Sequence, residues 1–371
     1  MNEKKWYKIK DEEKLMTPGL VVYPERIKKN IQSMIQLSGD ASRLFPHVKT
    51  HKMKEIVRLQ QDYGIQSFKC ANLGEVQMLI DCEVKHILLA IQPTEEKALR
   101  FLELQKQFPQ IFFSTLVDNQ DSLNLFSVLS KERKQKMNLW IDVNNGMNRT
   151  GIVPEAAENL YWLLDADSAL RFLGFHVYDG HIRPTDLQER IEKCHADFDP
   201  VEILVDRIEQ KGGVVHDIIT GGSPSFYPHA LRKKSKLSPG TTLLWDLNYQ
   251  KIWEETPFVH AAVLVTRLIS KPYADTMCFD LGHKAVASEM PLPRVKILGL
   301  EGAIHERQSE EHLVVRHENA DQFKVGELFY ALPYHICPTV AKYQKAYTVI
   351  KGQLKSFWEI EARDYQTGQL L

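Results

Sequence analysis

The sequence has no long apolar run and no excess of charge of one sign. Its longest apolar stretches, Phe258–Val265 and Ile111–Val117, are strand-sized and fall short of the ~18 residues needed to cross a bilayer. The 47 Lys and Arg side chains nearly balance 48 Asp and Glu side chains, giving a formal net charge of −1, so no basic field indicates nucleic-acid binding. A membrane protein and a generic nucleic-acid binder are therefore disfavoured.

Cysteine is also scarce. The five cysteines are an odd number in 371 residues, and residues 1–14 lack the apolar core of a signal peptide. Both features favour reduced thiols in the cytoplasm over a disulfide framework. Hydrophobic residues make up 43% and charged residues 26%, which is typical of a soluble globular chain. The length indicates about two domains.

Short apolar runs alternate with helix-like stretches, such as Glu25–Leu37 and Thr94–Phe108, from about residue 19 to residue 246. This alternation predicts an α/β fold, either a closed (β/α)8 TIM-like barrel or an open doubly wound sheet. No GxGxxG-type loop follows the early strands, so we favour the barrel. The runs number nine, one more than a barrel needs: Gly19–Tyr23, Leu44–Lys49, Ser67–Ala71, His86–Ala90, Ile111–Val117, Met137–Asn144, Leu170–Tyr178, His216–Gly221 and Thr241–Asp246.

After Asp246 the helical periodicity disappears. Short β-like runs punctuated by Gly, Pro, Asn and Asp predict a C-terminal, mostly antiparallel β domain. We expect the barrel to span residues 24–240 and the β domain to span residues 241–371. The runs are Val259–Leu268, Thr276–Asp280, Val295–Gly299, His312–Arg316, Glu327–Ala331, Ala346–Ile350 and Phe357–Glu361.

Reactive side chains follow several of the predicted barrel strands, and functional residues of a barrel gather at the carboxyl ends of its strands. The residues concerned are His47, Lys49, His51 and Lys52 in HVKTHK, Arg149 in NNGMNRTG, Tyr178, Asp179 and His181 in YDGH, and Thr220–Pro224 in TGGSP. This concentration predicts an active site at that end of the barrel.

Lys49 and the TGGSP turn each fit a specific chemistry. Burial and neighbouring cations would lower the pKa of Lys49, and a neutral lysine amine is the nucleophile of Schiff-base chemistry. The alternative is a lysine that points into water. In TGGSP, two glycines and Ser223 present N–H and hydroxyl donors to an anion, at the usual phosphate-binding position of such barrels. The alternative is a plain turn.

His335 and Cys337 lie two residues apart in a β-like segment, so alternation predicts that both side chains share one face. Imidazole and thiolate together suit zinc. The alternative is one buried cysteine beside an incidental histidine. We expect the other cysteines to be small core residues without such partners.

Two further features are less specific. The polar turn with Asp280, Gly282 and Lys284 is either structural or faces the site from a partner subunit. The charge-rich stretches Lys131–Lys136 and Arg232–Lys236 are expected to be solvated helix faces.

Taken together and in this order, the motifs resemble the D-threonine aldolase / D-serine dehydratase family, within the pyridoxal-phosphate enzymes of the alanine-racemase fold type. The PHVKTHK and HxCP motifs carry the resemblance most specifically, and NGMNRTG is shared more widely across the fold type. The motifs are TPGLVVY (Thr17–Tyr23), PHVKTHK (Pro46–Lys52), NGMNRTG (Asn145–Gly151), YDGH (Tyr178–His181), TGGSP (Thr220–Pro224), PGT (Pro239–Thr241) and HICPT (His335–Thr339).

The resemblance implies a role for each motif. Lys49 would bind pyridoxal 5'-phosphate as a Schiff base, and Arg149 and Tyr178 would line the cofactor ring. The phosphate would be held by Thr220, Gly221, Gly222 and Ser223.

In the β domain, His335 and Cys337 would bind a divalent metal, zinc first and Mn or Mg as alternatives. The family architecture also implies that residues 1–23 associate with the β domain and that the enzyme is a homodimer with active sites near the interface. Two residues depart from the family pattern, Phe45 before Pro46 and Glu289 in place of an aspartate, and they leave substrate specificity open.

The resemblance implies a metal-assisted lyase that acts on D-3-hydroxy amino acids. A cysteine at 337 is the dehydratase-like choice, so we favour D-serine dehydratase-like activity on D-serine or D-threonine, with 3-hydroxyaspartate also open. Retro-aldol cleavage to glycine and an aldehyde is the alternative, with His181 as a candidate base. An amino-acid racemase and a non-catalytic cofactor-binding protein are further alternatives. A racemase would need a second base beside Lys49, and a cofactor-binding protein would have no need of the metal pair.

Overall fold

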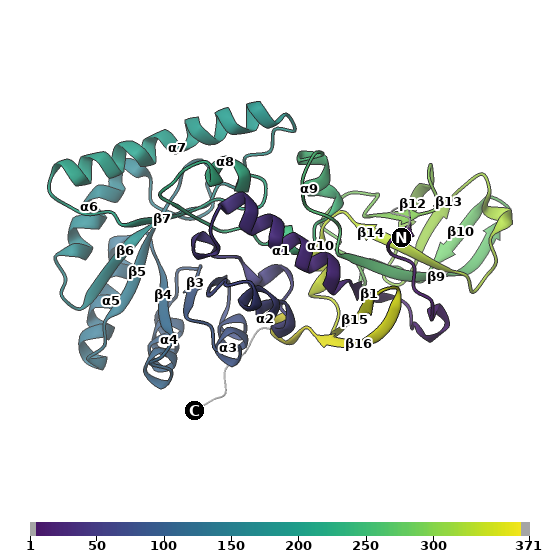
Figure 1. Cartoon of the computed structure of the whole chain (residues 1–371), viewed down its shortest axis with the longest axis horizontal. Coiled ribbons are helices and arrows are strands. Elements are labelled where there is room, and N and C mark those ends of the chain that lie inside the picture. The colour runs from purple at the N-terminus through teal and green to yellow at the C-terminus, as the bar shows by residue number, and fades with distance from the viewer. Residues whose placement is uncertain (1–4, 365–371) are drawn as a thin grey trace.

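The alternating runs of the first 240 residues form a parallel sheet wrapped by helices, on the left in Figure 1. The computed structural model describes residues 5–364. The seven strands, in their order in the sheet, are β2 (Ser67–Cys70), β3 (His86–Leu89), β4 (Phe112–Val117), β5 (Met137–Val143), β6 (Leu170–Val177), β7 (Asp217–Thr220) and β8 (Ser235–Leu237). The helices are α1 (Pro24–Ser38), α2 (Lys54–Asp62), α3 (Leu73–Asp81), α4 (Glu95–Gln107), α5 (Gln120–Arg133), α6 (Pro154–Asp165), α7 (Leu187–Gln210) and α8 (Phe226–Ala230).

An irregular segment closes the sheet into a barrel. The chain from Leu44 to His47 lies between the two edge strands, since Leu44 bridges to Leu237 of β8 and His47 bridges to Lys69 of β2. The predicted strand Leu44–Lys49 is therefore reduced to these bridges, and the chain turns at once into a 3-10 helix, Val48–Thr50. The TIM-like α/β architecture is confirmed, with an irregular eighth member.

The last barrel strand lies earlier than predicted. Residues 241–246 form no strand, and Thr241–Leu243 is a 3-10 helix. The edge strand is Ser235–Leu237, which overlaps the end of the stretch Arg232–Lys236 that was expected to be a solvated helix face. Ser235 and Leu237 are buried and only Lys236 between them is partly exposed, so the surrounding lysines concealed a short strand.

Large apolar side chains fill the barrel interior. One buried cluster consists of Phe45 from the closing segment and of Leu88, Leu116, Trp140 and Ile219 from β3, β4, β5 and β7. A barrel filled in this way is a packed core and not a pore. Chemistry is therefore confined to the rim where the strands end.

The second body is a nine-stranded sheet, on the right in Figure 1. Strand β1 (Gly19–Val22) lies inside it, antiparallel to β9 and parallel to β15. All other pairings in this sheet are antiparallel, which confirms the predicted β architecture. The remaining strands are β9 (Ala262–Tyr273), β10 (Thr276–Phe279), β11 (Val295–Leu298), β12 (Ile304–Gln308), β13 (Leu313–Arg316), β14 (Leu328–Pro333), β15 (Lys345–Ile350) and β16 (Gln353–Glu359). The boundary after residue 240 stays a prediction.

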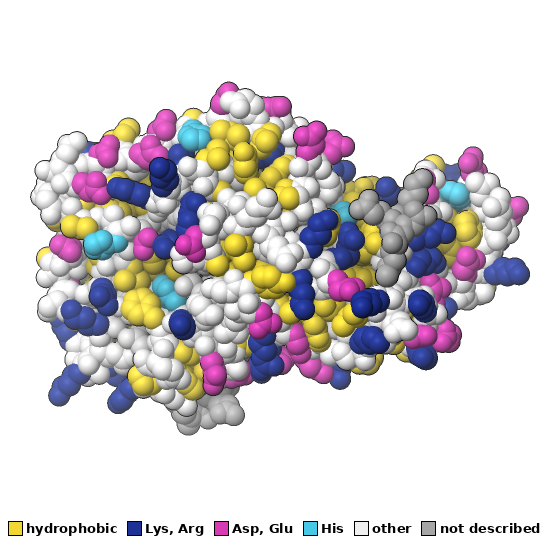
Figure 2. All heavy atoms as spheres, viewed as in Figure 1, with side chains coloured by type: hydrophobic (Ala, Val, Ile, Leu, Met, Phe, Trp, Pro, Cys, Tyr) yellow, Lys and Arg dark blue, Asp and Glu magenta, His cyan; other side chains and the backbone are white. Residues whose placement is uncertain are grey.

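The sequence analysis missed β12, because its IHERQ sequence has no apolar alternation and the strand lies at the edge of the sheet. Two short helices, α9 (Leu247–Ile252) and α10 (Ile336–Val340), lie where the two bodies meet (Figure 1). Among residues 5–364, no helix has the length and apolarity to span a bilayer. Figure 2 shows charged side chains of both signs scattered over the face in view, as the near-zero net charge predicts.

Candidate functional site

A cavity of about 300 Å³ opens at the carboxyl ends of the barrel strands. It contains three of the residues that the sequence singled out, Lys49, Arg149 and Tyr178. The lining residues are His47, Lys49, Lys69, Ala71, Ala90, Ile91, Gln92, Arg149, Thr150, His176 and Tyr178.

The Tyr178 ring is the centre of this cavity. The guanidinium carbon of Arg149 lies 4.8 Å from the ring centroid, and the Nζ atoms of Lys49 and Lys69 lie 5.8 and 5.6 Å from it. The aromatic face attracts such cations. Three positive groups around one ring give the cavity a field that favours an anionic or electron-rich ligand.

A hydrogen-bonded chain underlies this cavity. Lys69 Nζ lies 3.1 Å from His176 Nε2, and His176 Nδ1 lies 2.6 Å from Asp142 Oδ1. Gln92 and Thr150 donate to the other oxygen of Asp142 at 2.8 and 3.0 Å. Burial would raise the pKa of Asp142, but the hydrogen bonds from His176, Thr150 and Gln92 hold it below its usual value.

Lys69 is a residue that the sequence analysis missed. It lies in the predicted strand Ser67–Ala71, and the feature that could have revealed it is the presence of a lysine in the middle of an apolar strand. Burial, reinforced by the charge of Lys49, lowers its pKa to about 7.

The glycine-rich loop Thr220–Ser223 follows β7 and reaches the same ring. Gly221 has φ +70°, and a Cβ at Gly222 would lie 3.0 Å from Cε2 of Tyr178. The Ser223 Oγ accepts the N–H of Thr241 at 3.1 Å, which leaves its own hydrogen available to donate. The N–H groups of Gly221 and Gly222 are used within the protein, by Val177 O at 2.9 Å and Ser225 Oγ at 3.1 Å. The Ser223 hydroxyl is therefore the donor that this loop can offer to an anion, and none of residues 220–223 is among the residues that line the cavity.

A buried polar group holds this loop from behind. Asp179 accepts from Ser225 Oγ at 2.5 Å and lies 2.6 Å from His229 Nε2, while Ser225 in turn accepts the Gly222 N–H at 3.1 Å. Cys194 Sγ lies 3.4 Å from His229 Nε2. The expectation that the other cysteines lack a metal-capable partner such as histidine is therefore wrong for Cys194.

Asp179, Cys194 and His229 are also a group of three metal-capable side chains, with ligand atoms within 4.8 Å of one another. Their contacts are hydrogen bonds, and burial raises the pKa of the Cys194 thiol well above its usual value. A protonated thiol is a poor metal ligand. We interpret the group as the support of the loop.

His335 and Cys337 approach the barrel rim from the β domain. The predicted β-like segment is wrong here, because β14 ends at Pro333 and Cys337 lies in helix α10. The two side chains nevertheless lie close enough for each to shift the pKa of the other. Cys337 Sγ lies 3.2 Å from the hydroxyl of Thr50, next to Lys49, and 3.4 Å from that of Thr241.

Each member of this pair stabilises the charged form of the other. Burial alone would raise the pKa of Cys337, but His335, Thr241 and Thr50 lower it. Burial alone would lower the pKa of His335, but Cys337 and Glu289 raise it to about 9. Glu289 Oε1 lies 2.5 Å from His335 Nδ1, so the residue that departs from the family pattern contacts the pair directly.

Asp246 joins the two bodies at this point. It is fully buried, Oδ1 accepts the N–H of Tyr249 at 2.9 Å, and Oδ2 accepts the N–H of Ile336 at 3.1 Å. One carboxylate thus caps α9 and fixes the backbone between His335 and Cys337. The sequence analysis missed Asp246, whose role is visible only when both helices are in place.

Other singled-out residues lie elsewhere. His181 is absent from the cavity lining and pairs with Asp197 of α7 at 2.8 Å. Asp280 accepts from the hydroxyls of Thr17 and Thr266 at 2.5 and 2.6 Å and so ties β9 and β10 to the segment before β1. Lys284 pairs with Glu310 and Glu311 in the β domain.

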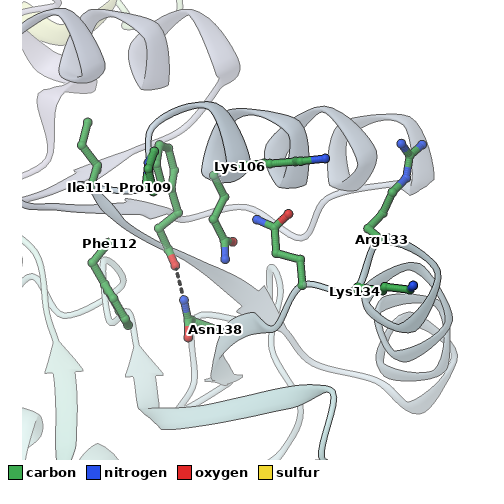
Figure 3. Close-up of a pocket in the computed structure, with 10 residues that line it drawn as sticks. Lys106, Pro109, Ile111, Phe112, Arg133, Lys134 and Asn138 are labelled. Carbon is green, nitrogen blue, oxygen red and sulfur yellow. Dashed lines mark hydrogen bonds between the residues drawn. The ribbon is translucent and has the colours of Figure 1, made fainter.

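A second cavity of about 430 Å³ lies at the opposite, amino-terminal end of β4 and β5. Figure 3 shows Lys106 on α4 and Arg133 and Lys134 where α5 ends. Cations at helix carboxyl ends offset the helix dipole, which accounts for their presence. Its described lining holds no histidine, cysteine or carboxylate, so the rim cavity is the candidate active site.

Several known proteins are similar to this chain in sequence or fold. Residues 22–244 match the family described as "Alanine racemase, N-terminal domain", and residues 261–349 match "Putative serine dehydratase domain". D-threonine aldolase of Arthrobacter sp is 25% identical over 94% of this chain and 93% of its own length. D-threo-3-hydroxyaspartate dehydratase of Delftia sp. (strain HT23) is 24% identical over 93% of this chain and 97% of its own. A crystal structure described as D-threonine aldolase from Filomicrobium marinum superposes with a TM-score of 0.85 at 22% identity, covering 94% of this chain and 96% of that chain.

Proposed function

Because this chain belongs to the family of the alanine racemase N-terminal domain, we propose that it is a pyridoxal-phosphate-dependent lyase of D-3-hydroxy amino acids that dehydrates its substrate. D-Serine or D-threonine would yield a 2-oxo acid and ammonia. The observation that carries the dehydratase assignment is the His335–Cys337 pair beside the loop of Lys49. The match of residues 261–349 to a serine dehydratase domain supports it.

The residues around Tyr178 fit pyridoxal phosphate. Lys49 supplies the amine that would bind the cofactor, and Arg149 and Tyr178 would line the cofactor ring. The space kept open at Gly222 and the hydroxyl of Ser223 suit the phosphate. When bound, the cofactor accepts the electrons that remain at the substrate's α-carbon after a bond to that carbon breaks.

The donor set at the edge of this cavity fits zinc. Imidazole and thiolate are ligands that zinc prefers, and two protein ligands leave positions for water or substrate. A metal held by His335 and Cys337 would polarise the substrate's 3-hydroxyl as a Lewis acid. Mn or Mg stays an alternative.

The chain's own groups then divide the work. As a free amine, Lys49 would remove the proton from the substrate's α-carbon. Arg149, which lies over the Tyr178 ring, would stabilise negative charge on the substrate. Ala71, Ala90 and Ile91 form the apolar part of the cavity wall and would limit the water in it. Asp246 keeps the His335–Cys337 backbone in position.

Retro-aldol cleavage is the second candidate, favoured by the similarity to a D-threonine aldolase over 94% of this chain. D-Threonine separates the two reactions. Purified protein loaded with pyridoxal phosphate and zinc should release 2-oxobutanoate and ammonia, and Lys49→Ala should release neither. Glycine and acetaldehyde would show that the aldolase reaction is the correct one. A homodimer with sites near its interface stays a prediction from the family resemblance.

A further inference from the structure

Lys69 is a buried cation with an unusual set of partners. Its side chain is 3% exposed and lines the rim cavity, while its neighbours Phe68 and Cys70 are fully buried. No carboxylate of the described residues lies within ion-pair distance of its Nζ, and the one hydrogen-bond partner given for that atom is His176. A lysine that served only to stabilise the core would be expected to pair with a carboxylate.

The tautomer of His176 follows from its partners. The carboxylate of Asp142 can only accept, so His176 Nδ1 carries the hydrogen of the 2.6 Å contact. The Nε2 lone pair therefore faces Lys69 at 3.1 Å and accepts one of its N–H groups. Burial and the charge of Lys69 lower the pKa of His176, which keeps the ring neutral and available as this acceptor.

The groups that surround Lys69 bring its two protonation states close in free energy. Burial is the largest effect that lowers its pKa, followed by the cations Lys49 and Arg149, whereas Asp142 and Asp179 act in the opposite direction. His47 and His176 face the same cluster of charges. The resulting pKa of about 7 is where a group transfers protons most effectively at neutral pH.

We propose that Lys69, oriented by His176 and Asp142, is a second proton-transfer group of the active site, working beside Lys49. This inference rests on the proposed function and deepens it. In dehydration one proton leaves the α-carbon and one proton joins the departing hydroxide to form water. With two amines in the cavity, one takes the first proton while the other delivers the second, and both return to their starting states by exchange with solvent. In the retro-aldol alternative, the proton leaves the 3-hydroxyl and another reaches the α-carbon.

The first test measures Lys69 directly in the cofactor-free protein. Lysines labelled with ¹³C at Cε are titrated by NMR, and the Lys69 signal is the one missing from Lys69→Met. We expect it to titrate near pH 7, and His176→Gln to shift that midpoint. A midpoint near 10.5, the ordinary value, would overturn the proposal.

The second test separates proton transfer from simple charge. Lys69→Arg keeps the positive charge but does not deprotonate, and Lys69→Met removes both properties. We expect both variants to load cofactor and to lose about 100-fold in kcat, with the acidic limb of the wild-type pH profile absent. The exposed Lys97→Met on α4 is the matched control and should retain full activity.

One result would count against this role, and another would count against the proposed function alone. Wild-type kcat in Lys69→Arg would mean that Lys69 supplies only charge. If the wild-type protein converts no D-3-hydroxy amino acid, the proposed function fails, and a Lys69 midpoint near pH 7 would still mark a proton-exchanging group in the cavity.

Discussion

Replacing Lys69 with methionine should make the cofactor-free protein more stable at neutral pH. The pKa of Lys69 falls from 10.5 to about 7 in the folded chain, so the folded state pays a free-energy cost to keep this ammonium buried. Methionine has nearly the same length, carries no charge and suits an apolar strand. The variant therefore removes the cost and leaves the barrel packing intact.

The stability difference between wild type and Lys69→Met depends on pH because the folded and unfolded states bind protons with different affinity. The folded pKa lies below the unfolded one, so between pH 7 and pH 10.5 the unfolded state binds more protons and wild-type stability rises with pH. At about 1.4 kcal/mol for each tenfold difference in proton affinity, the cost is about 4 kcal/mol at pH 7 and approaches about 5 kcal/mol at lower pH. It falls to about 2 kcal/mol at pH 9 and disappears near pH 10.5.

Urea unfolding of the wild-type protein and Lys69→Met at pH 7, about 9 and 10.5 measures this difference. The excess stability of the variant should shrink steadily with pH, and Lys97→Met should show none at any pH. Equal pH dependence in wild type and Lys69→Met would refute the electrostatic reasoning, as would a variant less stable than wild type at pH 7.

Three further substitutions test the rest of the site. Cys337→Ala should lose bound zinc, measured by metal analysis, and keep the visible absorbance of bound cofactor; unchanged zinc would contradict the ligand assignment. Asp246→Asn keeps one acceptor oxygen where two backbone N–H groups bind, so one hydrogen bond that positions His335 and Cys337 is lost. Such a bond contributes about 1–1.5 kcal/mol, and zinc affinity should therefore fall about tenfold. Asp186→Asn, which alters the cap of α7, should bind zinc as wild type does. Gly222→Val should weaken cofactor retention in equilibrium dialysis, because its Cβ would lie 3.0 Å from the Tyr178 ring; undiminished loading would place the phosphate elsewhere.

Sequence periodicity was sufficient to predict the architecture, because alternating strand and helix patterns indicate a parallel sheet, and the carboxyl ends of its strands lie along the same rim. This reasoning is why Lys49, Arg149 and Tyr178, which follow different strands, could be expected around one cavity, and the structure brings them together. It failed where charged residues conceal a strand, as at Ser235–Leu237, and where a strand gives way to a helix, as at α10.

Other features depend on contacts that no local pattern contains. Cys194 on α7 meets His229 on α8 only through the packing of those helices. Asp246 and Ile336 are 90 residues apart in the chain. Lys69 did leave a local signal, a cation within an apolar strand, but its meaning requires the position of His176 on a distant strand.

The position of β1 has a consequence for how the protein is made. Leu20, Val21 and Val22 are fully buried, yet Val21 pairs with Val263 on one side and Tyr347 on the other. At about 5–20 residues per second, a ribosome adds the second partner strand roughly 15–65 seconds after β1 has been synthesised. Strand β1 is thus enclosed only after β15 has been synthesised. A release from the ribosome before residue 345 would leave an apolar strand open to aggregation, so the yield of folded protein depends on the synthesis of β15.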